Sequence, residues 1–314
     1  MITTSRRGTE QVNVGSELLV DPPGRLRISA DRATPREVPQ VRTVRLMGAP
    51  FAEISESDAV RLIVDAAIKR RGHWTITANL DHLRRYTRDA QARRLIDDAD
   101  MVVADGTPLV WASRLAGVPL PERVAGSDMI WSICEAISHS QGSVFLLGGD
   151  PGVATAAARV LAENNPGLVI AGTSCPPMGF ENDAREVDRI VAQLRATAPQ
   201  IVLVGLGFPK QDLLISQLRQ LLPSVSFIGV GISLSFVAGE MSRAPKWTQR
   251  FGLEWLVRLL KEPRRLARRY LLQGIPFALE LFASGLRYRV QVGGREGRWG
   301  WDHPDRGQRA PDPG

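Results

Sequence analysis

Residues 144–164, VFLLGGDPGVATAAARVLAEN, combine a short apolar run, a glycine-rich turn and a helical pattern. The apolar run predicts a strand over Val144–Leu147, and the apolar spacing after the turn predicts a helix over Val153–Asn164. A strand followed directly by a helix is the repeating unit of a parallel sheet, because the helix returns the chain to start the next strand in the same direction. This stretch therefore favours an α/β fold.

The same alternation continues on both sides of this unit. Further apolar runs predict strands over Trp74–Asn79, Met101–Ala104, Leu168–Gly172, Ile201–Gly205 and Ser226–Val230. Helical patterns lie between them, over Ser57–Arg71, Leu83–Ala99, Pro108–Leu115, Ser127–Ser140, Asp183–Thr197 and Lys210–Leu222, with Ser127 expected as an N-cap. Short apolar strands separated by helices are typical of a parallel sheet covered by helices on both faces.

The two ends of the 314-residue chain differ in composition from its middle. Residues 1–42 and 291–314 are polar, rich in Arg, Pro and Gly, and without periodicity, so we expect disordered tails. Between them we expect an α/β core over 43–242 and a basic helical appendage over 243–290.

The composition also indicates the cellular compartment. Two cysteines, Cys134 and Cys175, fit a reducing environment without a disulfide framework. No stretch reaches the roughly 18 apolar residues of a membrane span, and the first residues lack the apolar region of a secretory signal. We therefore expect a cytoplasmic protein whose contact with a membrane is peripheral.

The positive charge of the chain is concentrated near its C-terminus. From Arg243 to Arg289, eleven Lys and Arg face three acids, a local balance of +8, whereas the whole chain carries +7. Trp and Leu residues are interleaved with these cations at helical spacing. Such a segment favours an anionic, partly apolar partner, either a membrane surface or a lipid-linked phosphate. The competing interpretation is a solvated basic face on an ordinary helix.

Ligands of open parallel sheets bind beyond the carboxyl ends of the strands, so the residues that follow each strand carry the functional information. These residues are Thr77 and Asn79, Asp105–Gly106, Gly148–Gly152, Gly205–Gly207 and Gly229–Gly231. Most are glycine or small polar residues, which allow backbone N–H groups to approach a phosphate closely.

Two of these turns suggest phosphate binding. Gly148 and Gly149 precede a helix whose first amides can hold a diphosphate, although a tight turn without a ligand explains them equally well. After Gly207, a helix opens with Lys210 and Gln211, which are suited to a phosphate and to a sugar or base respectively. The alternative for this pair is an exposed helix start.

Asp105 directly follows a wholly apolar strand and lies in a turn that Gly106 closes. A carboxylate in that position is suited to act as a general base. An Asx-turn or a helix N-cap is the alternative. Arg123, in a proline-rich loop, is a candidate anion clamp or an ordinary surface residue.

Other chemistries find little support in the residues. Asp98 and Asp100 form a D-x-D pair, but they end a helix before a strand, and no Cys/His spacing fits zinc, so we expect no metal and no cofactor. The fingerprint of a dinucleotide-binding oxidoreductase is absent. A nucleic-acid-binding module would leave the glycine-rich strand ends without a role, so we expect no nucleic acid.

Seven motifs together resemble the WecG/TagA/CpsF family of bacterial glycosyltransferases. They are TANLDHL (77–83), ADGTPLVWASRLAG (104–117), RVAGSD (123–128), FLLGGDPGVA (145–154), VGLGFPKQD (204–212), GVG (229–231) and RAPKW followed by GLEWLVRLLKEPRRLARRY (243–270). They occur in the order of the family and span residues 44–272. One departure is Asp212, where the family usually carries Glu.

The resemblance implies a cytoplasmic, metal-independent transferase with a Rossmann-like core and a C-terminal helical appendage. It implies transfer, with inversion, of an N-acetylmannosamine-type sugar or uronic acid from a UDP-sugar to a polyprenyl-diphosphate-linked saccharide in cell-surface polysaccharide synthesis. By motif position, Asp105 matches the base, and the substrate-contacting residues are Thr77, Asn79, Arg123, Gln211, Arg258, Arg265 and Arg268. The alternative is an inactive, membrane-associated homologue that binds its ligands without transfer. A homo-oligomer is left open.

Overall fold

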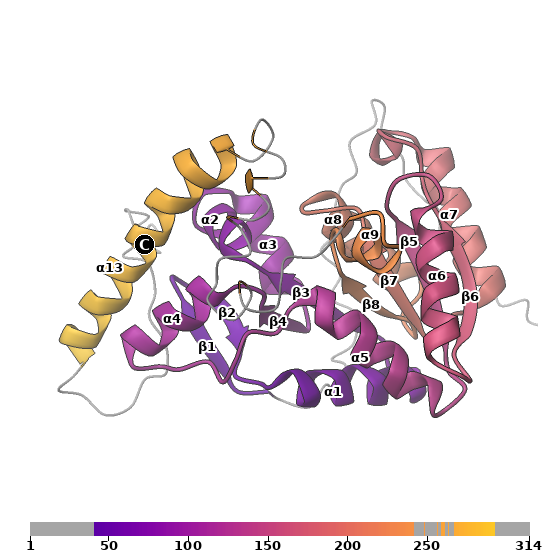
Figure 1. The fold of residues 1–314 in the computed structure, drawn as a ribbon, viewed down its shortest axis with the longest axis horizontal. Helices are drawn as coiled ribbons and strands as arrows, with labels where there is room; N and C mark the ends of the chain where they lie inside the picture. Colours follow the sequence, from indigo (N-terminus) through magenta and orange to yellow (C-terminus); the bar gives the residue numbers. More distant parts are fainter. Residues whose placement is uncertain are drawn as a thin grey trace, which may run out of the picture.

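The computed structural model describes residues 41–241, 248, 256, 259–260, 263 and 267–292. Its centre is a six-stranded sheet in which every neighbouring pair is parallel (Figure 1). The strands run in the order β4 (Met101–Ala104), β3 (His73–Ala78), β8 (Ser226–Gly229), β7 (Ile201–Gly205), β5 (Ser143–Gly148) and β6 (Val169–Ser174). The predicted α/β class is confirmed.

Both faces of the sheet are buried because alternate side chains of each strand enter different hydrophobic clusters. Phe145 and Leu147 of β5 belong to one cluster, and Val144 and Leu146 belong to the other. The first cluster includes helices α2 (Leu80–Arg88), α3 (Ala90–Asp98), α4 (Thr107–Ala116), α7 (Ala184–Thr197) and α8 (Lys210–Leu221). The second includes α1 (Glu56–Ile68), α5 (Gly126–Ser138), α6 (Val153–Asn164) and α9 (Ser233–Val237).

The prediction of one helix over Leu83–Ala99 is wrong, because Asp89 divides this stretch into α2 and α3. Asp89 has an extended backbone, its N–H donates to the Arg85 carbonyl at the end of α2, and its side chain accepts from the Gln91 N–H at the start of α3. A short carboxylate competes with helical hydrogen bonding in this way.

Ser127 is not the N-cap of its helix. The cap is Ala125, whose side chain makes no capping bond, and α5 begins at Gly126. A side chain at Gly126 would lie 3.1 Å from the Thr77 hydroxyl on β3, so α5 begins in close contact with the sheet.

A two-stranded hairpin was not predicted. Strands β1 (Thr43–Leu46) and β2 (Ala49–Ala52) pair antiparallel, and β2 packs beside β4 at the end of the sheet. Each strand has only four residues, and their turn places both Met47 and Gly48 at positive φ. Such short strands carry too little alternation to be recognised in the sequence.

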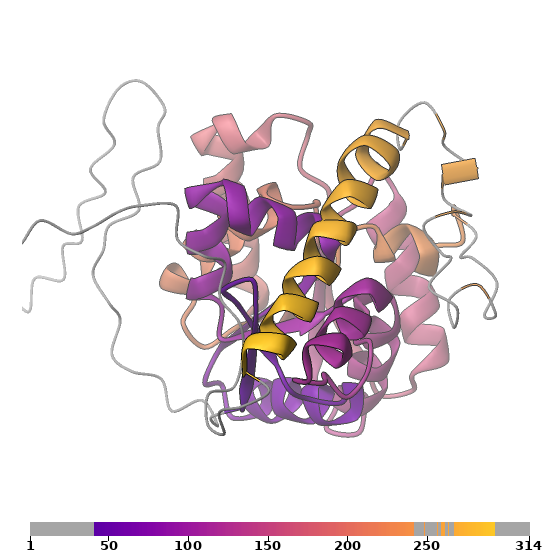
Figure 2. The same cartoon turned by 90° about the vertical axis from the view of Figure 1, so that its left-hand side faces the viewer.

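The C-terminal helix α13 (Ile275–Val292) lies across the outer side of α4, preceded by a π-helical turn η2 (Arg268–Gly274) (Figures 1 and 2). The α13 side chains of Phe277 and Leu281 are fully buried against the protein, and Gly285 allows α13 to approach α4 closely. Arg88 of α2 packs over the Phe277 ring at 5.7 Å and pairs with Glu280 at 3.3 Å. α13 is therefore docked onto both α2 and α4.

Replacing Phe277 with Ala should lower the free energy of unfolding by about 3–5 kcal/mol, because it leaves a cavity under α13. Leu279→Ala on the same helix removes a side chain that is 64% exposed, and should change stability by less than about 1 kcal/mol. Denaturant unfolding of both variants measures the difference, and equal losses would contradict the docked position of Phe277.

Candidate functional site at the carboxyl edge of the sheet

Asp105 lies at the carboxyl end of β4, as predicted, and its side chain is 29% exposed. Its backbone N–H donates to the Ala78 carbonyl at 2.8 Å, which ties it to the end of β3. One carboxylate oxygen accepts from the Gly126 N–H at 3.4 Å, and the other lies 3.9 Å from the Arg123 guanidinium. The N-cap of the following helix α4 is Gly106 and not Asp105. The carboxylate thus faces the start of α5 and a cation.

Arg123 lies between two carboxylates. Its Nη1 is the atom 3.9 Å from Asp105, and its Nη2 donates to Asp128 of α5 at 3.0 Å. The loop that carries Arg123 is anchored because the Val124 N–H donates to the Ala104 carbonyl at 2.9 Å. The predicted anion clamp is therefore brought to Asp105, and it binds carboxylates of the protein itself.

Thr77 and Asn79 meet at the same edge, where both make hydrogen bonds within the protein. The buried Thr77 hydroxyl donates to the Gly229 carbonyl of β8 at 2.8 Å. The Asn79 side chain caps α2 by accepting from the N–H groups of Asp81 and His82 at 3.0 and 3.3 Å. These bonds hold the ends of β3 and β8 and the start of α2 in place.

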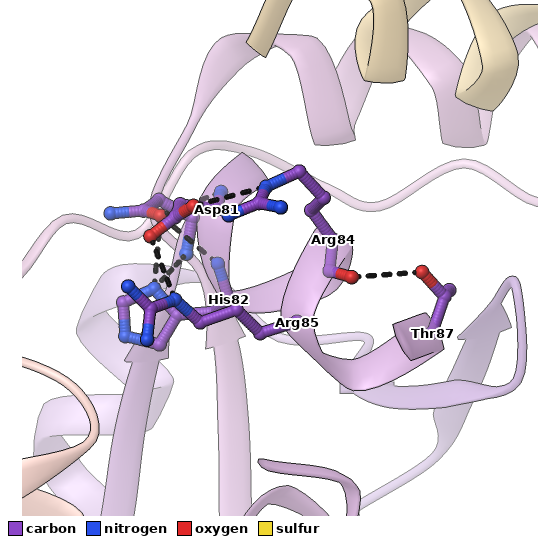
Figure 3. A network of polar contacts seen from close by, with 6 residues as sticks. Asp81, His82, Arg84, Arg85 and Thr87 are labelled. Atoms are coloured by element: carbon purple, nitrogen blue, oxygen red, sulfur yellow. Dashed lines mark hydrogen bonds and ion pairs between the residues drawn. The ribbon is translucent and has the colours of Figure 1, made fainter. Parts of the chain in front are cut away.

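The first turn of α2 carries a polar network (Figure 3). Asp81 accepts from Arg84 at 3.0 Å and from Arg85 at 3.2 Å (Figure 3). The His82 ring packs against Phe208 with ring centroids 4.5 Å apart. Since Phe208 lies in the loop between β7 and α8, this contact joins the start of α2 to the next glycine turn.

The glycine turns after β5 and β7 present bare backbone. Gly148, Gly149 and Gly207 all have positive φ, at 114°, 79° and 74°. A side chain at Gly148 would lie 2.6 Å from the Gly205 carbonyl, so only glycine fits between the two strand ends. Around Gly207 the space is open. The Gly149 N–H donates to the Gly205 carbonyl at 3.0 Å, and the two turns lead into α6 and α8, whose starts have no side-chain cap.

Gln211 is 2% exposed and links two turns. Its Oε1 accepts from the N–H groups of Gly207 at 3.2 Å and Gly231 at 3.3 Å. Its neighbour Lys210 forms an ion pair with Glu181 of η1 (Phe180–Asn182). For Lys210 to contact a phosphate, the phosphate must replace Glu181.

Asp212, in the first turn of α8, has no function predicted from the sequence. It is fully buried, and neither carboxylate oxygen has a hydrogen-bonding partner of normal geometry among the described residues. Burial raises its pKa to about 7, against weaker opposing effects of nearby Gln211 and Trp74. Its burial was not predicted, because a charged residue in a helical pattern is expected on the exposed face. In the structure, α8 turns this position toward the sheet.

Of the three candidate arginines of the C-terminal appendage, the structure describes one. Arg268 is exposed on η2, whereas Arg258 and Arg265 lie outside the described residues. Asp100 accepts from Arg219 at 3.0 Å and from the Trp74 N–H at 2.8 Å, so it stabilises the corner before β4. In the described part of the chain, no group of three His, Cys, Asp or Glu side chains is placed to hold a metal ion.

Known proteins resemble this chain over the same helices and strands. The model of the glycosyl transferase WecG/TagA/CpsF family matches residues 44–291, which include the whole sheet and most of α13. A Bacillus spizizenii protein named N-acetylglucosaminyldiphosphoundecaprenol N-acetyl-beta-D-mannosaminyltransferase is 32% identical over 200 residues, 64% of this chain and 76% of that protein. A Staphylococcus aureus protein of the same name is 32% identical over 215 residues, 68% of this chain and 81% of that protein.

The buried carboxyl of Asp212 should make stability depend on pH. Its pKa is about 7 in the folded protein and about 4 in the unfolded chain, so the folded state binds the proton more tightly. Stability should therefore fall as pH rises from 4 to 7, by up to about 4 kcal/mol from this group. Asp212→Asn should lack this dependence.

The measurement is thermal unfolding between pH 4 and 8. The difference in Tm between Asp212→Asn and the wild type should grow with pH across this window and become constant above it. Asp188→Asn, at an exposed position of α7, serves as the control. A difference that is flat with pH would show that Asp212 titrates normally.

Proposed function

Because this chain belongs to the WecG/TagA/CpsF family of glycosyltransferases, we propose that it moves an N-acetylmannosamine-type sugar from a UDP-sugar to a polyprenyl-diphosphate-linked saccharide. The names of its relatives indicate the sugar and the lipid-linked acceptor of those proteins. The observation that carries the proposal is the position of Asp105, a partly exposed carboxylate held between the start of α5 and Arg123.

In the proposed reaction Asp105 is the general base. Its carboxylate takes the proton of the acceptor hydroxyl as that oxygen forms a bond to the anomeric carbon of the donor. The bond from the anomeric carbon to the UDP oxygen breaks on the opposite side, so the configuration inverts and UDP leaves with the electron pair. The Gly126 N–H and Arg123 hold the carboxylate in position for this step.

The departing diphosphate needs positive partners, since its charge grows as the bond breaks. The turns at Gly148, Gly149 and Gly207 lead into the starts of α6 and α8, which have no side-chain cap and offer their helix dipoles at the same edge of the sheet. Lys210 is close to this edge and becomes available if a phosphate replaces Glu181. We assign Arg258, Arg265 and Arg268 of the C-terminal appendage to the same diphosphate, on motif position.

We also propose that the enzyme works at the cytoplasmic face of the membrane through its C-terminal helix. Opposite the face that packs on α4, α13 exposes an apolar stripe of Ile275, Leu279, Leu286 and Val290, which are 42%, 64%, 51% and 77% exposed. At 100° per residue, Arg287 and Arg289 lie on either side of this stripe. Apolar residues flanked by cations are suited to an anionic lipid surface.

The described residues contain no helix that is both long and apolar enough to cross a bilayer.

Replacing Asp105 with Asn keeps its shape and removes its basicity, so turnover should fall by about 10²–10⁴-fold while UDP-sugar binding persists. Release of UDP with a short-chain polyprenyl-diphosphate acceptor measures turnover, and calorimetry measures donor binding. The assay is run with and without EDTA, because the proposal requires no metal. Normal turnover of the variant would remove Asp105 from the mechanism. A wild-type protein that binds donor but never transfers would be the inactive homologue.

The double variant Leu279→Ser, Leu286→Ser should reduce binding to liposomes with anionic lipids by at least about tenfold, because two apolar contacts are lost. Turnover on a water-soluble acceptor should not change. Leu221→Ser removes an exposed Leu of α8, 40% exposed, and should bind liposomes normally. Raising the salt concentration should weaken wild-type binding. Unchanged binding of the double variant would exclude the stripe as the membrane contact.

A further inference from the structure

Arg123 is shared unequally between two carboxylates. Its distance to Asp128 is 3.0 Å and its distance to Asp105 is 3.9 Å, so the closer ion pair is with the residue that has no assigned part in the reaction. All three side chains are only partly exposed, at 22% for Arg123, 29% for Asp105 and 33% for Asp128. Charge interactions at such positions are screened less than on an open surface.

Asp128 and Arg123 lie on different elements. It lies in the first turn of α5, where a carboxylate interacts favourably with the helix dipole, whereas Arg123 lies in the loop before that helix. The 3.0 Å ion pair therefore ties the Arg123 guanidinium to the start of α5.

Further acidic groups surround the pair. Glu56 at the start of α1 accepts from the Ser132 hydroxyl of α5 at 2.8 Å, and its own N–H donates to Glu122 at 2.7 Å. Burial raises the pKa of Glu56, and the charges of Asp128 and Glu122 raise it further, against the hydrogen bond from Ser132 and the charge of Arg123. Among the described residues, the charged groups near Asp105 include Arg123 and Asp128, and Glu56 and Glu122 lie near Asp128.

A guanidinium is able to bind one carboxylate with two parallel hydrogen bonds. If Arg123 bound Asp105 in this way, it would occupy the oxygens that must accept the proton from the acceptor hydroxyl. It would also favour the charged form of Asp105 and weaken it as a base. The pair with Asp128 prevents both effects while leaving Arg123 near enough to orient Asp105.

We propose that Asp128 is a positioning residue for the transfer reaction, which holds Arg123 away from a close ion pair with Asp105 and so keeps Asp105 available as the base. This inference rests on the proposed role of Asp105. Asp128 acts through Arg123 and has no need to touch the substrate.

The test is the pH profile of turnover in the full-length enzyme. In Asp128→Asn, Arg123 is released toward Asp105, so maximal turnover should fall by about tenfold. The acidic limb of the profile, where turnover rises with pH, should move about one pH unit lower. Adding Arg123→Gln to Asp128→Asn should return the limb to the wild-type pH or above it. Asp128→Glu, which keeps the charge, should leave the limb in place. A purely structural Asp128 would change the Tm without moving the limb.

Glu122→Gln is the matched control, because it neutralises a nearby carboxylate that contacts Glu56 and leaves the ion pairs of Arg123 intact. Its limb should stay at the wild-type pH. If Asp128→Asn does not fold, Arg123→Gln alone tests the same arrangement and should move the limb to higher pH. An unmoved limb in that variant would overturn the inference.

Failure of the proposed function and failure of the inference about Asp128 give different results. Normal turnover of Asp105→Asn would refute the proposed function. An inactive Asp105→Asn combined with a wild-type profile for Asp128→Asn would refute only the inference about Asp128.

Discussion

The close approach of bare backbone at the carboxyl edge of the sheet is the constraint on which the site depends. A side chain at Gly148 would lie 2.6 Å from the Gly205 carbonyl, and one at Gly205 would lie 2.8 Å from the Gly231 carbonyl. The ends of β5 and β7 therefore approach their neighbours this closely only because Gly148 and Gly205 carry no Cβ. The turns that follow β5 and β7 lead into α6 and α8, whose starts have no side-chain cap and are suited to a diphosphate.

The start of α5 connects the remaining parts of the site. Gly126 packs against Thr77 of β3 and donates its N–H to Asp105 after β4, and Thr77 in turn bonds the Gly229 carbonyl of β8. The loop before the helix supplies Arg123, and the first turn supplies Asp128. Charges that are fixed by the fold before the substrate binds need no rearrangement during the reaction, which is the condition for effective electrostatic catalysis.

The C-terminal helix is attached to the two helices that begin at the site. α2 starts at the Asn79 cap and α4 starts two residues after Asp105, and α13 contacts both. Arg88 links α2 to α13 through Phe277 and Glu280. One face of α13 is thus committed to the protein, while its other face leaves Leu279 and Val290 exposed to solvent.

The sequence alone determined the fold class, the strands of the parallel sheet and the positions of Asp105, Thr77 and Asn79 at its carboxyl edge. Runs of apolar residues and their period are local properties, and the carboxyl ends of parallel strands necessarily meet at one edge. Tertiary structure alone decided the start of α5, where the expectation for Ser127 was wrong, the division of α2 from α3 at Asp89, and the hairpin β1–β2. It also decided the burial of Asp212 and the ion pairs of Arg123 and Lys210. Each of these features depends on residues that packing brings together. A local sequence pattern does not encode the space that a neighbouring element leaves or the charge that lies opposite a side chain.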